Sequence, residues 1–135
     1  MAHWIRTHLD VSATDYQAVI PVPLHDTKQR ERGFNQAAQL AGMISHQTGI
    51  PQIINLLRRI RPTDSQTHLT RSKRQANMKN AFAAAFSPVE FISVLLVDDV
   101  LTTGATASEC AKTLKRCGIS KVNVLTLARG MPAYF

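Results

Sequence analysis

The sequence predicts a single α/β domain in which a mostly parallel central sheet is flanked by helices in three layers. Short runs of branched apolar residues alternate with segments whose apolar residues recur every three or four positions, which is typical of strand–helix–strand units. The run at 91–97, Phe-Ile-Ser-Val-Leu-Leu-Val, is almost uninterrupted, as expected of a central strand that is buried on both faces. A chain of 135 residues with 44% hydrophobic content is large enough for one domain with a sizeable core.

The first strand of this domain is predicted at 18–22, Ala-Val-Ile-Pro-Val. Residues 1–16 are mixed and polar, and we expect them to form a lead-in segment to a domain that spans 17–135. Because proline lacks a backbone donor, Pro21 and Pro23 indicate that the strand ends early or lies beside a weak partner.

A helix is predicted after Gly33. Apolar residues then recur every three or four positions, so they share one helical face; they are Phe34, Ala37, Ala38, Ala41 and Ile44. Gly49 and Pro51 are the stop signals expected just beyond a helix.

The middle of the chain is predicted to contain two short strands separated by a long loop. The first strand is expected at 53–57 and the second at 81–86, where Ser87-Pro88 ends it. Residues 58–80 contain few large apolar side chains, and a loop of this length is typical of a lid or a binding loop.

The last part of the chain predicts a second helix and a final strand. The T-x-x-E spacing from Thr106 to Glu109 is that of a capping box, so the helix is expected to begin near Thr106 and to end at Gly118. The final strand is predicted at 122–127. A strand, a helix and a strand with short connections form a right-handed crossover, which makes the sheet mostly parallel.

Charge and cysteine content narrow the class of protein further. A formal charge of +7 favours polyanionic ligands. Cys110 and Cys117 lie about two helical turns apart, too far for a disulfide, and we expect both thiols to be buried core groups.

No apolar run reaches the roughly 20 residues that cross a bilayer, and no secretory signal is present at the N-terminus, so we expect a cytoplasmic protein with no membrane span.

The turn at 98–106, Asp-Asp-Val-Leu-Thr-Thr-Gly-Ala-Thr, is the candidate binding site. Ligands bind at the carboxyl ends of parallel strands, and the backbone amides at a helix N-terminus suit a phosphate. Glycine allows the backbone to approach an anion, and threonines add hydroxyl donors. Two neighbouring carboxylates suit sugar hydroxyls rather than a bare phosphate. The turn therefore predicts a ribose-5-phosphate site made of Asp98, Asp99, Thr102, Thr103, Gly104, Ala105 and Thr106.

This turn has other possible interpretations. Taken singly, the two acids could be turn residues and Thr106 a helix cap. The Rossmann and P-loop motifs are absent from the sequence. A receiver domain would place paired acids after its first strand, but only 36 residues (135 − 99) follow Asp99.

Residues 94–106 closely resemble the 5-phosphoribosyl-1-diphosphate (PRPP) signature of type I phosphoribosyltransferases. Two further stretches are similar to the ComF/GntX branch of that superfamily, which is named for competence for DNA uptake. They are Arg32-Gly33-Phe34-Asn35-Gln36 and the spaced set Thr63, Gln66, Leu69, Arg74, Asn77, Ala81 and Phe82. The resemblance covers about residues 17–129.

The resemblance implies a role for each part of the candidate site. Thr102 to Thr106 would bind the 5-phosphate, and Asp98 and Asp99 the ribose hydroxyls. Residues 61–80 would form a flexible lid that closes during catalysis and excludes water. The diphosphate, with its Mg²⁺ ion, would face Pro23, Leu24 and His25, helped by the lid cations Arg74, Arg71 and Lys73. The residues expected to be catalytic are Asp98, Asp99 and Arg74, and no metal held by protein side chains alone is expected.

Three functions follow from this reasoning. The first is an enzyme that transfers phosphoribosyl from PRPP to an unidentified acceptor, such as a base. The second is a non-catalytic module that senses PRPP or a nucleotide. The third is a single-stranded DNA accessory protein in competence, which ranks last because no aromatic residue is interleaved with the basic residues of 58–79.

The acceptor and the oligomeric state stay open at this stage, homodimerisation included. Members of the branch often carry a four-cysteine zinc-binding segment before the transferase-like domain, and this sequence contains none. In the superfamily, the part outside the shared core generally helps to select the acceptor.

Overall fold

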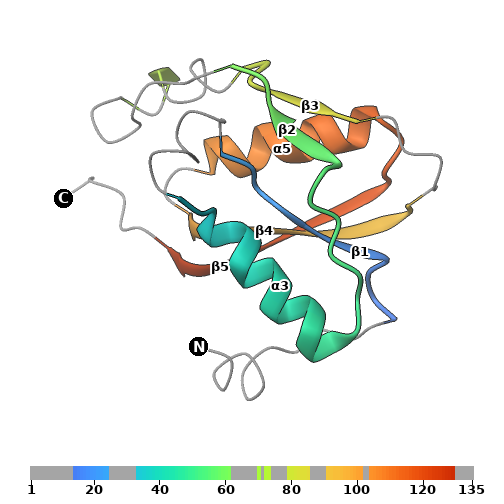
Figure 1. Cartoon of the computed structure of the whole chain (residues 1–135). Coiled ribbons are helices and arrows are strands. Elements are labelled where there is room, and N and C mark those ends of the chain that lie inside the picture. Colours follow the sequence, from blue (N-terminus) through green and yellow to red (C-terminus); the bar gives the residue numbers. More distant parts are fainter. Residues whose placement is uncertain are drawn as a thin grey trace.

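Three parallel strands, in the order β1-β4-β5, form the centre of the structure. The structure is a computed structural model that describes residues 14–24, 33–61, 70, 72–73, 79–85, 91–101 and 104–129. The strands are β1 (Ala18–Pro21), β4 (Ser93–Leu101) and β5 (Lys121–Arg129). The prediction of a central parallel strand is confirmed (Figure 1).

Strand β4 continues further than its apolar run. It was predicted at 91–97, but it pairs with β5 as far as the partners Leu101 and Arg129. Asp98 and Asp99 therefore lie within the strand, because the backbone of β5 still offers hydrogen-bond partners there. Strand β1 ends at Pro21, as its prolines predicted.

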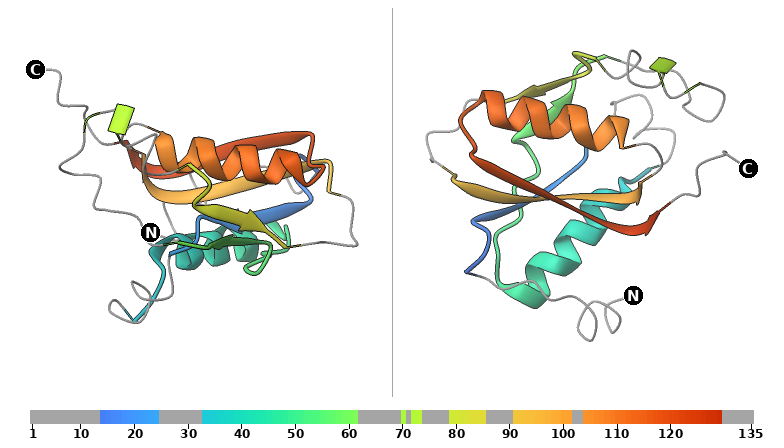
Figure 2. Two further views of the ribbon diagram at one scale, coloured as in Figure 1. Left: turned by 90° about the horizontal axis from the view of Figure 1, so that it is seen from above. Right: turned by 180° about the vertical axis from the view of Figure 1, so that it is seen from behind.

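Two helices cover opposite faces of this sheet (Figure 2). Helix α3 (Gln36–Thr48) lies on one face and α5 (Ala105–Arg116) on the other. Successive strand residues alternate between two separate apolar clusters, as the period of a strand requires. The α3 side contains Val19, Leu40, Ala41, Ile44, Ile50, Leu95 and Val97, and the α5 side includes Ile20, Val94, Leu96, Cys110 and Leu114. The three-layer α/β prediction is confirmed.

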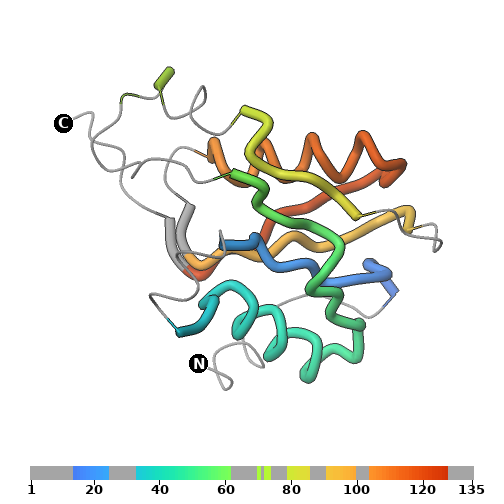
Figure 3. Tube along the Cα trace, turned by 45° about the horizontal axis from the view of Figure 1, so that its top comes forward, coloured from blue at the N-terminus to red at the C-terminus, as the bar shows by residue number. Residues whose placement is uncertain are grey.

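A small antiparallel sheet packs on the α5 side. It consists of β2 (Leu57–Arg59) and β3 (Phe82–Ala84). The prediction of a strand at 53–57 is wrong in its bounds. The strand predicted at 81–86 is present, but it covers only Phe82–Ala84. After a single bridge to β1 at Gln52, the chain turns away from the central sheet and finds its strand partner only in β3 (Figure 3).

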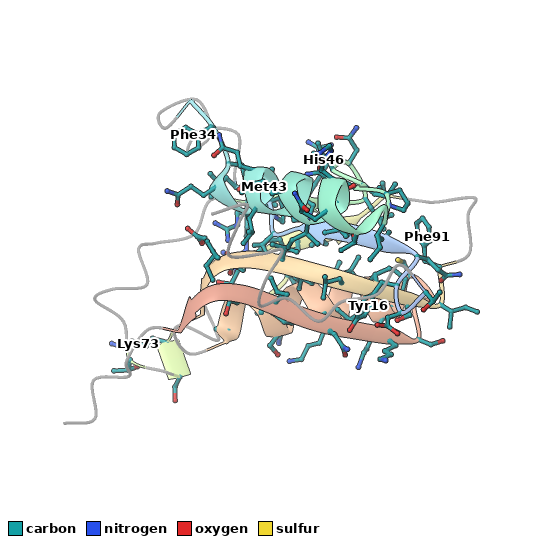
Figure 4. All side chains as sticks on the ribbon, turned by 90° about the horizontal axis from the view of Figure 1, so that it is seen from below. Tyr16, Phe34, Met43, His46, Lys73 and Phe91 are labelled. Atoms are coloured by element: carbon teal, nitrogen blue, oxygen red, sulfur yellow. The ribbon has the colours of Figure 1, made fainter. Side chains whose placement is uncertain are left out.

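Helix α3 begins at Gln36, two residues later than its apolar pattern indicated. The side-chain oxygen of Asn35 accepts hydrogen bonds from the backbone N–H groups of Ala37 (3.0 Å) and Ala38 (3.4 Å), which makes Asn35 the N-cap. Phe34 therefore precedes the helix and is 43% exposed, so its predicted place on the apolar face of the helix is wrong (Figure 4). Gly49 ends the helix with a φ of 79°, as predicted.

Helix α5 lacks the predicted capping box. Its N-cap is Gly104, which makes no side-chain capping hydrogen bond. The carboxylate of Glu109 is used elsewhere: Oε1 accepts from the backbone N–H of Asn80 at 3.2 Å, which ties the start of β3 to α5. The interpretation of Thr106 as a cap is therefore wrong.

The two cysteines differ in exposure. Cys110 is fully buried, as predicted, whereas Cys117 is exposed. The prediction fails for Cys117 because the helix ends at Arg116, which leaves Cys117 as the C-cap at its exposed end. Both thiols are free. Within the segments that the structure describes, no helix combines the length and apolar character needed to cross a lipid bilayer.

Candidate functional site

A pocket of about 160 Å³ opens at the carboxyl ends of β1 and β4. The chain after β1, the start of α3, strand β2, strand β4 and the first turn of α5 all contribute to its wall. The lining residues are Val22, Pro23, Leu24, Asn35, Gln36, Ala37, Arg59, Asp98, Asp99 and Thr106. The fold thus brings together five of the residues predicted from the sequence: Pro23, Leu24, Asp98, Asp99 and Thr106.

The two carboxylates of the pocket interact with each other. The backbone N–H of Asp99 donates to Oδ1 of Asp98 at 2.9 Å. Burial raises the pKa of Asp98 to about 7, and the side-chain hydrogen bond and charge of Asp99 act in the same direction. The backbone bond and the charge of Arg59 oppose this rise. Near neutral pH, Asp98 can therefore accept or donate a hydrogen bond, which suits a ligand that carries hydroxyl groups.

The N-terminus of α5 has the character of an anion site. Gly104 has a φ of 82°, in the left-handed region that favours glycine, and no acidic residue lies in the first turn. The positive end of the dipole of this 12-residue helix therefore lies at the carboxyl ends of the strands. No acid in its first turn neutralises that positive end. Thr106 brings that turn into the wall of the pocket, while Ala105 is buried.

The other predicted residues are either described but not in the pocket wall, or outside the described residues. Lys73 is exposed and is not among the residues that line the pocket. Five others lie outside the described residues: His25, Arg71, Arg74, Thr102 and Thr103. Most of the predicted lid at 61–80 also lies outside them. Among the residues that are described, no cluster of three or more His, Cys, Asp or Glu side chains could hold a metal ion.

Asn35 is a pocket residue that the site prediction did not include. Besides capping α3, its Nδ2 donates to the carbonyl of Val22 at 3.1 Å. This bond joins the end of β1 to the start of α3, so one side chain holds two walls of the pocket together. Asn35 lies in the Arg-Gly-Phe-Asn-Gln stretch that carried the resemblance, and that stretch was the signal that could have identified it.

Arg59 is another pocket residue that the site prediction did not include, because in the sequence it is only one of several basic residues within 58–79. Its guanidinium carbon lies 4.9 Å from the centre of the Phe82 ring, within range of a cation–π interaction. Burial lowers the pKa of Arg59, while the nearby Cys110 and Asp98 groups oppose this. Its Nε is enclosed and has no hydrogen-bond partner. Side chains alternate between the two faces of a strand, so an inward Leu57 and an outward Arg58 could have indicated that Arg59 points inward.

Comparison with known proteins identifies relatives of this chain. No family model matches it. It is 43% identical to competence protein F of Haemophilus influenzae over 115 residues, which are 84% of this chain and 50% of that protein. It is 36% identical to the DNA utilization protein YhgH of Escherichia coli K12, in a match that covers 82% of this chain and 48% of that protein. It is 32% identical to competence protein ComFC of Bacillus subtilis, in a match that covers 82% of this chain and 44% of that protein. The chain spans about half the length of these curated relatives.

Solved structures identify the fold. Glutamine PRPP amidotransferase from B. subtilis, solved with ADP and GMP, matches 93% of this chain and 24% of its own chain, with a TM-score of 0.60 and 18% identity. Adenine phosphoribosyltransferase from Saccharomyces cerevisiae matches 95% of this chain and 62% of its own chain, with a TM-score of 0.55 and 10% identity. The comparisons confirm the resemblance to the ComF branch and to the type I phosphoribosyltransferase fold.

Proposed function

We propose that this ComF-like chain, which has the type I phosphoribosyltransferase fold, binds PRPP and transfers its phosphoribosyl group to an acceptor with release of diphosphate. One observation carries the proposal: the carboxylates of Asp98 and Asp99 and the first turn of α5, through Thr106, line the same pocket. Hydroxyl-binding acids and an anion-binding helix end are what a sugar phosphate requires.

The proposed placement of PRPP follows this arrangement. Its ribose hydroxyls lie on Asp98 and Asp99, and its 5-phosphate lies on the turn from Thr102 to Thr106. The diphosphate, with Mg²⁺ as its counter-ion, lies along Pro23, Leu24 and His25. Arg74, with Arg71 and Lys73, approaches the diphosphate from the segment 61–80.

The reaction breaks the bond from C1 to the diphosphate oxygen and forms a bond from C1 to the nucleophile of the acceptor. Positive charge grows on the ribose, and negative charge grows on the leaving diphosphate. The carboxylates of Asp98 and Asp99 stabilise the first, while Arg74 and the Mg²⁺ that accompanies PRPP stabilise the second. An acceptor such as a base enters from the open side of the pocket.

A sensing module is the second candidate function. The names of the relatives, competence protein F and DNA utilization protein, describe a process rather than a reaction. A protein that binds PRPP or a nucleotide without turnover would serve such a process with the same pocket. A role in DNA uptake or use is compatible with either function.

Calorimetry with PRPP and Mg²⁺, and separately with ribose 5-phosphate, tests the binding step. Asp98→Asn combined with Asp99→Asn should weaken binding of both ligands by about tenfold or more, because hydrogen bonds to charged groups contribute roughly 1.5–3 kcal/mol each. Asp15→Asn, a change of an exposed acid outside the pocket, is the matched control and should bind as the wild type does. Absence of binding to the wild type at millimolar ligand would refute the proposal.

Diphosphate release in the presence of a panel of bases and nucleosides separates the two functions. Release that depends on one acceptor supports the transferase. Tight PRPP binding without release for any acceptor supports the sensing module instead.

A further inference from the structure

Among the described residues that line the candidate pocket, Arg59 is the only cation, and Asp98 and Asp99 are the only acids. When all three side chains are ionised, the wall therefore carries two negative charges against one positive charge. Neighbouring carboxylates disfavour each other's ionised form, and a nearby cation favours it. The position of Arg59 therefore bears on how easily the acid pair ionises.

Strand register holds Arg59 in this position. Arg59 of β2 is paired directly with Phe82 of β3, so the two side chains lie on the same face of the small sheet. The guanidinium carbon lies 4.9 Å from the centre of the ring, and Phe82 is only 5% exposed. The backbone N–H of Ile60 donates to the carbonyl of Ala81 at 2.7 Å, which continues the pairing of the two chains beside this contact. The cation is thus held against a buried ring.

Arg59 is the cation that favours the ionised form of Asp98. Burial raises the pKa of Asp98 to about 7, and the side-chain hydrogen bond and charge of Asp99 add to this rise. The charge of Arg59 opposes it, together with the backbone hydrogen bond from Asp99. Cys110, on α5, also lies near these groups, but burial raises the pKa of its thiol, so Cys110 carries no charge near neutral pH.

The other elements around Asp98 bring no further cation to it within the described part of the chain. Helix α3 and the chain after β1 supply only uncharged side chains to the pocket wall. The residue of β5 that pairs with Asp98 is Thr126. On α5, Glu109 is buried, and its Oε1 accepts the backbone N–H of Asn80.

The interaction between Arg59 and Asp98 stabilises both ionised groups. The Nε of Arg59 is enclosed and forms no hydrogen bond within the described residues. A partly buried cation with an unpartnered donor is costly, and burial accordingly lowers the pKa of Arg59. The charge of Asp98 opposes that lowering, just as the charge of Arg59 opposes the rise at Asp98.

We propose that Arg59 is a positioning residue of the candidate site: held on Phe82, it acts through Asp98 and keeps that side chain available as a carboxylate that accepts hydroxyl groups of the ligand. The inference rests on the proposed function for the nature of the ligand, a sugar phosphate. The interaction between Arg59 and Asp98 itself can be measured in the free protein.

NMR titration of the aspartate carboxyl carbons in the ligand-free chain tests this interaction directly. The Asp98 signal is assigned by its loss in Asp98→Asn. Arg59→Met removes the charge but keeps bulk against Phe82, whereas Arg59→Lys keeps the charge. Arg58→Gln removes an equal charge from the neighbouring, exposed position of β2 and is the matched control.

We expect the titration midpoint of Asp98, about pH 7 in the wild type, to move upward by roughly one pH unit in Arg59→Met. Arg59→Lys and Arg58→Gln should titrate close to the wild type, because one keeps the cation and the other removes an exposed one. Phe82→Leu keeps the cation but removes the ring that holds it, so it should give a smaller upward shift even if Arg59→Met does not fold. Midpoints that move no further in Arg59→Met and Phe82→Leu than in Arg58→Gln refute the inference.

Calorimetry with ribose 5-phosphate between about pH 5 and pH 9 adds a functional readout. The phosphate of the ligand titrates identically in every experiment, so differences between variants report on the protein. A shift of one pH unit at Asp98 should weaken binding to Arg59→Met by about fivefold at pH 7 and leave it within about twofold of the wild type at pH 9. A loss of affinity that is equal at every pH would mean that Arg59 contacts the ligand directly, and it would overturn the positioning role.

This inference and the proposed function fail in different ways. If the wild type does not bind ribose 5-phosphate at any pH, the proposed function fails, while the NMR titration still decides whether Arg59 sets the ionisation of Asp98. If the wild type binds, but Arg59→Met and Arg58→Gln change its affinity equally, the positioning role is refuted and the proposed function stands.

Discussion

Replacing Asp98 by asparagine should stabilise the folded chain at alkaline pH while weakening its ligand site. Asp98 lies in the pocket wall, where burial and the neighbouring Asp99 raise its pKa from an ordinary value of 3.8 to about 7. Asparagine keeps an oxygen that can accept the backbone N–H of Asp99, but it cannot ionise. The substitution therefore removes an electrostatic cost and keeps the local hydrogen bond.

The size and the sign of the effect follow from proton linkage. A carboxyl whose pKa is raised in the folded state binds its proton more tightly there than in the unfolded chain, so the free energy of unfolding falls as pH rises from about 4 to about 7. At about 1.4 kcal/mol for each tenfold change in proton affinity, the full cost is about 4 kcal/mol. Because Asp98 lines an open pocket, solvent reduces the cost of ionising its carboxyl. We therefore expect Asp98→Asn to be more stable than the wild type by about 2–4 kcal/mol at pH 8.

Urea denaturation followed by circular dichroism at pH 5, 6, 7 and 8, at constant ionic strength, measures this difference. The advantage of Asp98→Asn over the wild type should grow with pH and level off above pH 7. Asp15→Asn, a matched loss of an exposed carboxylate, should follow the wild-type curve. An advantage that does not change with pH, or a variant less stable than the wild type at pH 8, would refute the reasoning about Asp98.

Three further predictions concern the scaffold of the site. Asn35→Ala should lower the free energy of unfolding by about 1 kcal/mol or more in urea, because α3 loses its cap and β1 loses the bond to Val22. Leu114→Ala should cost about 2–5 kcal/mol in the same assay, because Leu114 is fully buried between α5 and the sheet. A thiol reagent should modify Cys117 rapidly in the native protein, and Cys110 only after denaturation, since burial raises the pKa of the Cys110 thiol and shields it.

Each of these predictions has a contradicting outcome. Unchanged stability of Asn35→Ala would show that water or another group caps α3 equally well. A loss below about 1 kcal/mol for Leu114→Ala would contradict tight packing under α5. Equal reaction rates of the two thiols in native protein would contradict the burial of Cys110.

The candidate binding turn could be recognised in the sequence because its requirements are local. The turn consists of two acids at the end of an apolar run and a glycine at the start of a helix. The adjoining strand and helix determine where these residues lie. This order places the acids after the buried part of β4 and Gly104 at the start of α5, whereas pairing with β5 keeps the acids within the strand. The resemblance to a known family rested on the same short segment.

The errors occurred where a residue's place depends on a distant partner. The strand expected at 53–57 begins instead at Leu57, because its partner is β3, some 25 residues later. Glu109 satisfies the backbone of Asn80 rather than capping its own helix, and that contact exists only after β3 has packed on α5. Neither the start of β2 nor the hydrogen bond of Glu109 can be predicted from the neighbouring residues.

The sequence by itself determined the alternation of strands and helices, the parallel central sheet and the acid pair at its edge, because periodicity and chain order act over a few residues. Only the tertiary structure decided that Arg59 stacks on Phe82, lies beside Asp98 and lines the pocket that contains both acids. The physical reason is that burial and charge at Arg59 come from strands β2, β3 and β4 and helix α5 meeting in space. A strongly basic composition alone cannot distinguish such a residue from a solvated surface cation.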